Sequence, residues 1–152
     1  MYLLSTSNQE EAQMRIRLSE KEILISPVQT AKVLQTVLKR EERNDQLKEH
    51  FWVFGLDSRN RIKYLELVSL GSLNSNLVHP REVFRLAIQK SICQIILAHN
   101  HPSGEVDPSE DDLKINKRLV EAGKIIGIEI LDHIIIAENY RYMSFKEKGL
   151  MK

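Results

Sequence analysis

The chain has 152 residues, the length of one ordinary domain, which is enough to bury a hydrophobic core without disulfides. Hydrophobic residues make up 42% and charged residues 28% of it, a balance typical of globular proteins that excludes disorder over the whole chain. The 22 basic and 21 acidic residues give a net charge of +1, so no global charge attracts nucleic acid or membranes. No apolar run approaches the roughly 18 residues that span a bilayer, and no signal peptide is recognisable. We therefore expect a cytoplasmic location.

The first part of the chain predicts an N-terminal extension and the start of a folded domain. Ser26 can cap a helix and Pro27 suits the first helical position, so a helix is expected to begin there. The charged run over residues 39–48 ends this helix and is expected to be a solvated surface. We divide the chain into an extension, residues 1–25, and one domain, residues 26–152.

A hairpin is predicted in the next segment. Residues 51–56 and 61–70 have strand patterns, and the polar residues 57–60 between them are typical of a turn. A helix is expected to begin at Pro80, and residues 94–98 predict a short buried strand.

The last third continues the alternation of helices and strands. Residues 100–108 contain two prolines and a glycine and predict a loop, after which Ser109 begins a helix with three acids in its first turn. Residues 128–137 are strongly apolar and predict a central strand, and residues 140–145 predict an edge strand that closes the sheet. This alternation favours an α/β fold with helices packed on a sheet.

The segment from His99 to Asp112 has the residues and spacing of a metal site. His99 and His101 stand two apart at the end of a strand, so their side chains point to the same side. Pro102 and Gly104 then turn the chain, and Asp112 falls in the first turn of the next helix. Two histidines and one carboxylate leave a fourth position open, as a catalytic zinc ion requires.

A hydrolytic site of this kind also needs a general base. Glu49, Glu66 and Glu105 are the candidates, being carboxylates upstream of the metal site or within its loop. Ser109 is expected to be the N-cap of the helix that carries Asp112.

Other residues are expected to be structural. His79 and His133 are predicted to be structural histidines, His50 a surface residue, and Cys93 a small buried thiol. Several familiar motifs are absent from the sequence. The single cysteine excludes the Pro-Cys-x-x-Cys signature of zinc deaminases. There is no His-Glu-x-x-His helix and no glycine-rich phosphate loop.

The pattern His99-x-His101-Pro102-x6-Ser109-x2-Asp112 is similar to the JAMM motif of JAB/MPN metalloproteases. The longer sequence His-Asn-His-Pro-Ser-Gly that begins at His99 resembles the RadC branch of that superfamily. The similarity runs over residues 49–150. It implies a three-layer α/β/α sandwich with a mixed sheet, similar to cytidine deaminases.

The resemblance also implies roles for individual residues. His99, His101 and Asp112 would be the ligands of Zn²⁺, and Ser109 would donate a hydrogen bond to an oxyanion. The family's catalytic glutamate lies just before or at the first central strand, where Glu49 matches best. Glu66 is the reserve candidate for the base.

The expected function is a zinc-dependent hydrolase that cleaves a peptide or isopeptide bond in an unidentified peptide or protein substrate. One alternative is a DNA-repair accessory protein or metal-dependent nuclease, which the RadC resemblance and the basic residues Lys114, Lys117 and Arg118 motivate. Full-length RadC proteins carry a helix-hairpin-helix region that residues 1–45 are too short and too charged to hold, so we expect no DNA contact of that kind. The other alternative is a non-catalytic MPN interaction module. The edge strand over residues 140–145 could pair with a second copy in a homo-oligomer.

Overall fold

The computed structural model describes residues 3–5, 26–71 and 78–151. The elements, in chain order, are β1 (Leu3–Ser5), α1 (Pro27–Lys39), α2 (Arg43–Gln46), β2 (Glu49–Leu56), β3 (Ile62–Gly71), α3 (Pro80–Val83), α4 (Arg85–Gln89), β4 (Gln94–Asn100), α5 (Glu110–Ile126), β5 (Glu129–Ile136) and β6 (Tyr142–Ser144).

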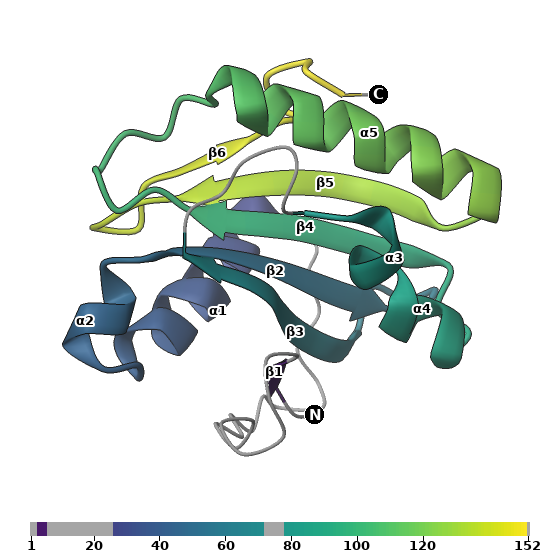
Figure 1. Ribbon diagram of the computed structural model, residues 1–152, viewed down its shortest axis with the longest axis horizontal. Coiled ribbons are helices and arrows are strands. Elements are labelled where there is room, and N and C mark those ends of the chain that lie inside the picture. Colours follow the sequence, from purple (N-terminus) through teal and green to yellow (C-terminus); the bar gives the residue numbers. More distant parts are fainter. Residues whose placement is uncertain (1–2, 6–25, 72–77, 152) are drawn as a thin grey trace.

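The strands form one mixed sheet in the order β1-β3-β2-β4-β5-β6 (Figure 1). β2 and β3 form the predicted hairpin, and β2 is also antiparallel to β4. β4 and β5 are parallel and are joined by α5, whereas β6 is antiparallel to β5 at the edge of the sheet, as predicted for this segment. The sheet therefore has β2 and β4, which carry most of the candidate site, side by side in its middle.

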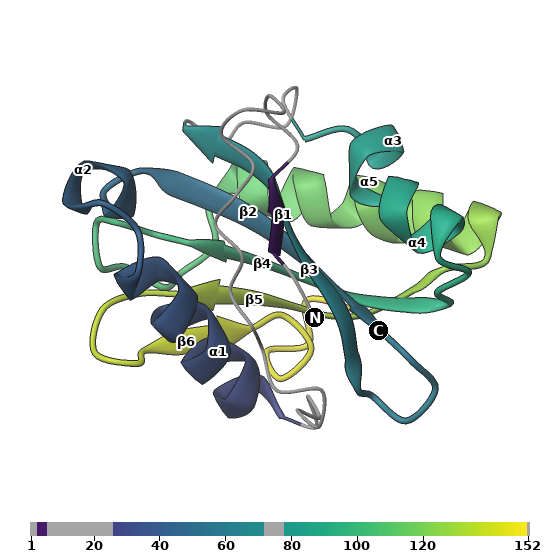
Figure 2. The same ribbon diagram turned by 90° about the horizontal axis from the view of Figure 1, so that it is seen from below.

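Helices cover both faces of the sheet, with α1 on one face and α5 on the other (Figures 1 and 2). Side chains of β2 alternate between two cores, because successive residues of a strand point to opposite faces. Trp52 and Phe54 belong to the core under α1, whereas Phe51 and Val53 belong to the core under α3, α4 and α5. A strand buried on both faces reads as a continuous apolar run, as residues 51–56 do. This arrangement confirms the predicted three-layer α/β/α sandwich.

Both long helices begin where their capping residues predict. Ser26 accepts a hydrogen bond from the backbone of Gln29, whose side chain accepts one from the Ser26 backbone in return. Ser109 and Asp112 form the same reciprocal capping box at the start of α5. α5 ends at Gly127, which has a φ of 76° in the left-handed region that favours glycine.

Several expectations for local structure are wrong. The helix predicted to begin at Pro80 is two short helices, α3 and α4, separated at Phe84. Leu3–Ser5 pairs in parallel with β3, although no strand was predicted there. The charged run over residues 39–48 is not simply a solvated surface, because it contains α2 and the buried side chain of Glu41. Cys93 is exposed rather than buried. It lies in the turn between α4 and β4, one residue before the strand begins, whereas the buried run starts at Ile95.

Within the described part of the chain, no helix has the length and apolar character that a bilayer span requires.

Candidate metal centre

Three side chains of the predicted ligand set meet at the end of β4. His99 and His101 lie at the carboxyl end of this strand and just beyond it, and Asp112 lies in the first turn of α5. The connecting loop reverses the chain at Gly104, whose φ of 89° favours glycine. His101 stays attached to the sheet because its backbone N–H donates to the Ile136 carbonyl at 2.9 Å. The strand, the loop and the helix start therefore bring the three side chains together.

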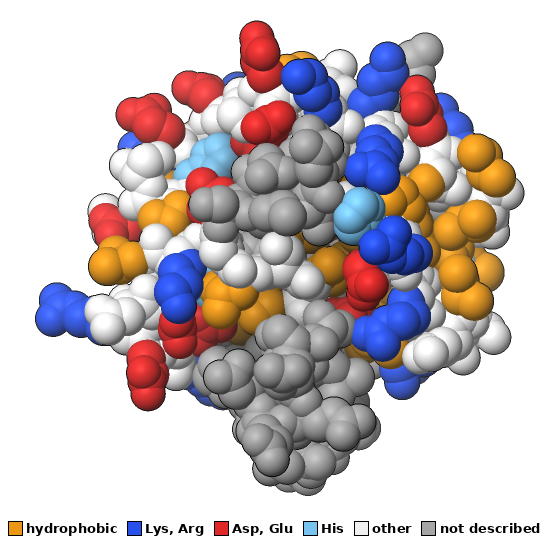
Figure 3. All heavy atoms as spheres, in the orientation of Figure 1, with side chains coloured by type: hydrophobic (Ala, Val, Ile, Leu, Met, Phe, Trp, Pro, Cys, Tyr) orange, Lys and Arg blue, Asp and Glu red, His pale blue; other side chains and the backbone are white. Residues whose placement is uncertain are grey.

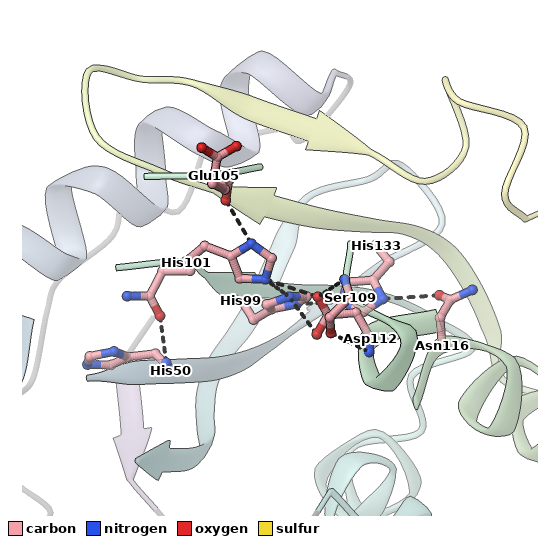
Figure 4. A network of polar contacts seen from close by, with 9 residues as sticks. His50, His99, His101, Glu105, Ser109, Asp112, Asn116 and His133 are labelled. Carbon is pink, nitrogen blue, oxygen red and sulfur yellow. Dashed lines mark hydrogen bonds and ion pairs between the residues drawn. The ribbon is translucent and has the colours of Figure 1, made fainter. Parts of the chain in front are cut away.

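The ligand atoms of these side chains converge on one point (Figure 4). His99 Nε2 lies 3.1 Å from His101 Nε2 and 3.2 Å from Asp112 Oδ1. His101 Nε2 lies 3.0 Å from Asp112 Oδ2. One ligand atom from each residue lies within 4.8 Å of the others, close enough for all three to hold one metal ion.

The other ring nitrogen of each histidine is held by a hydrogen bond that sets its tautomer (Figure 4). His101 Nδ1 lies 2.7 Å from the Glu105 carbonyl, which only accepts, so Nδ1 carries the proton. His133 Nδ1 donates to Asn116 Oδ1 at 3.1 Å, which leaves Nε2 of a neutral His133 to accept from His99 Nδ1 at 2.8 Å. Both ligand histidines therefore turn the lone pair of Nε2 toward the cluster, as metal-bound histidines do.

The chemistry of this donor set fits a metal cation. In their neutral forms His99 and His101 present lone pairs toward each other, and the carboxylate of Asp112 presents only acceptors. Facing acceptors at about 3 Å repel unless a proton or a metal ion lies between them. Two imidazoles and one carboxylate match the ligand types that zinc prefers and leave one position open.

Electrostatics in the cluster favour an ionised Asp112 and a neutral His99. Burial raises the pKa of Asp112, but the hydrogen bonds that His101 and His99 donate to it when their Nε2 atoms carry protons outweigh burial and hold that pKa well below its usual range. Burial lowers the pKa of His99. Burial also lowers the pKa of His133, and the charge of the neighbouring His99 lowers it further. Burial lowers the pKa of His101 as well, but the hydrogen bond with Asp112 outweighs burial, so the pKa of His101 is raised overall.

Ser109 connects the helix cap with the cluster. Its Oγ accepts from the Asp112 backbone N–H at 3.1 Å, and its own N–H donates to Asp112 Oδ2 at 2.9 Å. The cap thus holds the Asp112 carboxylate in place and leaves the hydroxyl proton of Ser109 available to another acceptor. Ser109 is exposed and lines the cavity in front of the cluster.

A cavity of about 730 Å³ opens onto the cluster. Glu49, His101, Ser109 and Asp112 all line it, so the structure brings Glu49 to the same space as the predicted ligands. His99 is only 1% exposed and Asp112 6%, whereas His101 is 14% exposed, so the cluster is reached from the side of His101. Figure 3 shows histidine side chains at the surface of this face of the molecule, with acidic side chains close by.

A hydrogen-bonded clamp holds the backbone on both sides of Glu49. The side chain of Asn100, which is buried and stands between His99 and His101 in the sequence, accepts from the His50 backbone N–H at 2.6 Å and donates to the Lys48 carbonyl at 3.0 Å. His50 Nε2 lies 2.5 Å from Glu41 Oε2, and both side chains are buried. The prediction that His50 is a surface residue is therefore wrong: the turn through α2 folds over it.

Glu66, the reserve candidate for the base, lies elsewhere. It is on β3 opposite Val53, fully buried, and does not line the cavity. Its Oε1 accepts from Arg85 Nη2 at 3.2 Å. Burial raises the pKa of Glu66 to about 7, although Arg85 acts in the opposite direction. Glu105 does line the cavity, but its side chain is exposed, and only its carbonyl contacts a ligand histidine.

The raised pKa of Glu66 predicts a pH-dependent stability. Between pH 4.5 and about 7 the folded protein keeps a proton on Glu66 that the unfolded chain releases, so the free energy of unfolding falls as pH rises through this window. The loss is on the order of 3 kcal/mol. Glu66→Gln should remove this part of the pH dependence, as measured by urea unfolding of both proteins at pH values below and above the window. If the free energy of unfolding of Glu66→Gln fell between the two pH values by as much as that of the native protein, Glu66 would not be the group responsible.

Comparison with known proteins identifies the family. A family model described as the RadC-like JAB domain matches residues 24–150. The chain belongs to this family.

Relatives of this RadC-like JAB domain occur in bacteria and archaea. The chain is 54% identical over 112 residues to a UPF0758 protein of Caldanaerobacter subterraneus, covering 74% of this chain and 48% of the relative. It is 55% identical over 102 residues to a UPF0758 protein of Listeria welshimeri, covering 67% and 45%. It is 50% identical over 108 residues to one of Methanosarcina mazei, covering 71% and 47%. The chain thus spans about half the length of these curated relatives.

Three polar residues around the cluster of this RadC-like domain were not predicted to act there. Asn116 stands four residues after Asp112, a spacing that puts both on one face of α5 and was a usable signal. His133 was predicted to be structural, and it is the buried partner of His99. Asn100 lies between the two ligand histidines, but its partners are 50 residues upstream, so no local pattern indicated its contacts.

Proposed function

We propose that this RadC-like JAB domain is a zinc-dependent hydrolase that cleaves a peptide or isopeptide bond. The observation that carries the proposal is the convergence of the lone pairs of His99, His101 and Asp112 on one point of a cavity that Glu49 and Ser109 also line. A zinc ion held by those three residues would polarise the carbonyl to be cleaved and lower the pKa of water.

The roles of the protein groups follow from their positions. Glu49 accepts a proton from the attacking water and passes it to the nitrogen of the leaving amine, so the carbon–nitrogen bond breaks to give a carboxylate and an amine. The Ser109 hydroxyl, whose proton the helix cap does not use, donates to the oxygen that becomes negative during attack. His133, Asn116 and the Glu105 carbonyl hold the ligand histidines in one tautomer and orientation.

A direct test compares zinc-loaded and zinc-free protein on mixed peptide substrates. One pool contains linear peptides and the other contains peptides joined through a lysine side chain, and mass spectrometry detects new carboxyl ends. We expect cleavage by the zinc-loaded protein that is lost on chelation and restored by added zinc. Cleavage that is indifferent to chelation, or no cleavage of either pool by fully loaded protein, would count against the proposal.

Asn100 is expected to be a positioning residue for Glu49. Asn100→Ala leaves the buried His50 N–H without its acceptor, which should cost about 1–3 kcal/mol of stability. On a substrate found in the screen above, we expect kcat to fall about 10- to 100-fold with KM little changed, because Glu49 loses its fixed backbone. Zinc content should stay near that of the native protein.

Asn100→Asp provides the comparison, since it keeps the acceptor for His50 but replaces the donor to Lys48 with a carboxylate oxygen. It should recover part of the lost kcat. A folded, zinc-loaded Asn100→Ala protein with native kcat would show that the clamp has no part in the reaction.

A further inference from the structure

A second groove adjoins the cavity of the candidate metal centre. It has a volume of about 460 Å³ and lies between the end of α1, α2 and the turn from β5 to β6. Leu47, His101 and Pro102 line both this groove and the cavity, so the two spaces meet at the segment that carries a predicted ligand. A polypeptide lying across this segment would occupy both spaces at once.

The groove has an excess of positive charge that no ion pair in the described part of the chain neutralises. Lys39 and Arg43 line it and are exposed, and neither has an ion pair among the described residues. Glu138 is the single acidic residue among its described lining residues. At the end of α1, Gln46 Nε2 donates to the Lys39 carbonyl at 3.5 Å and to the Glu41 carbonyl beyond the helix at 2.8 Å, so neither cation is the donor to these carbonyls. Their charges are therefore available to a bound anion.

Apolar side chains stand next to these charges. Leu47 is 69% exposed and Tyr140 is 54% exposed, so both offer apolar surface to a bound chain. The Tyr140 ring lies 5.0 Å from Lys39 Nζ. Asn139 and Tyr140 both have a φ near 60°, a conformation that non-glycine residues rarely adopt, and this turn holds the ring at the edge of the groove.

We propose that this groove, lined by Lys39, Arg43, Leu47 and Tyr140, binds an acidic side chain of a polypeptide substrate together with an apolar neighbour. The assignment of the bound chain as substrate rests on the proposed function, since the groove joins the cavity where cleavage would occur. A polypeptide fits better than nucleic acid, because two cations beside Glu138 and two exposed apolar groups match a mixed side-chain sequence rather than a run of phosphates.

The test is a binding measurement that needs no turnover. The zinc-loaded protein is titrated with acetyl-Leu-Glu-Leu amide and, separately, with acetyl-Leu-Gln-Leu amide, which differs only in charge, and backbone amide shifts are followed by NMR. We expect the glutamate peptide to bind about fivefold more tightly, with the largest shifts at Lys39, Arg43 and Tyr140, and this preference to shrink at high salt. Equal binding of the two peptides, or shifts elsewhere on the surface, would overturn the proposal.

Charge-reversal variants test whether the preference for the glutamate peptide arises in the groove. Lys39→Glu with Arg43→Glu should abolish the preference for the glutamate peptide. Lys32→Glu with Lys124→Glu makes the same change in net charge at exposed residues outside the groove and should keep it. If the reversed protein is poorly folded by circular dichroism, Lys39→Gln with Arg43→Gln replaces it. A preference that survives in the groove variant, or tighter binding of a single-stranded oligonucleotide than of the glutamate peptide, would refute the assignment.

The binding and cleavage experiments can refute the two proposals independently. Loss of cleavage with a retained glutamate preference would overturn the proposed function alone. Cleavage of peptides with no glutamate preference would overturn the groove proposal alone.

Discussion

The double variant His99→Ala with His101→Ala is expected to purify without zinc. It removes two of the three groups whose lone pairs converge, and the single carboxylate of Asp112 is too weak a site on its own. Removal of a residue that only hydrogen-bonds to a metal ligand lowers metal affinity about 10- to 100-fold. Loss of two ligands should lower the affinity for zinc by more than this. Elemental analysis of the purified protein measures the zinc content per chain.

The fold should survive this change, which makes the result interpretable. His101 is partly exposed, and the cavity left by His99 is bordered by the packed rings of Phe51 and His133. His79→Ala is a matched control, because it removes a histidine outside the cluster and should leave zinc content unchanged. Full zinc occupancy in a folded double variant would refute the ligand assignment.

Glu49→Gln is expected to keep zinc and to lose hydrolysis. The amide is nearly isosteric with the carboxylate but cannot accept a proton from water, and loss of a general base costs about 10²- to 10⁴-fold. Glu49 is not one of the three converging ligands, so elemental analysis should find normal zinc. The measurement is the initial rate of cleavage of a peptide or isopeptide substrate.

Glu66→Gln distinguishes the two candidate bases. Glu66 is buried away from the cavity, so this variant should retain most of the activity that Glu49→Gln loses. The reverse outcome would assign the base to Glu66. Native activity in both single variants would remove both carboxylates from the mechanism, and an inactive native protein with full zinc would favour the alternative of a non-catalytic interaction module.

The sequence alone was enough to predict which three side chains converge at the candidate metal centre and where the capped helix begins. His99 and His101 share one side because they are two apart on a strand, and Asp112 is placed by a capping box only four residues long. These are local relations, set by backbone geometry within a short stretch of chain. The alternation of helices and strands was likewise enough to predict the layered α/β fold.

Tertiary structure decided how the cluster is completed. Phe51 pairs with His99 in the sheet, and this register, which joins residues about 50 apart in the chain, brings Glu49 to the cavity and leaves Glu66 outside it. The same pairing places Asn100 against His50, which the sequence pattern had put on the surface. Burial of Cys93 was mispredicted because an apolar run indicates a buried strand but not the residue at which its burial begins, and here burial begins at Ile95. The three converging side chains could be predicted because their positions depend on neighbours in the chain. The place of Glu49 at the cavity, the Asn100 clamp and the groove depend instead on which distant segments pack together.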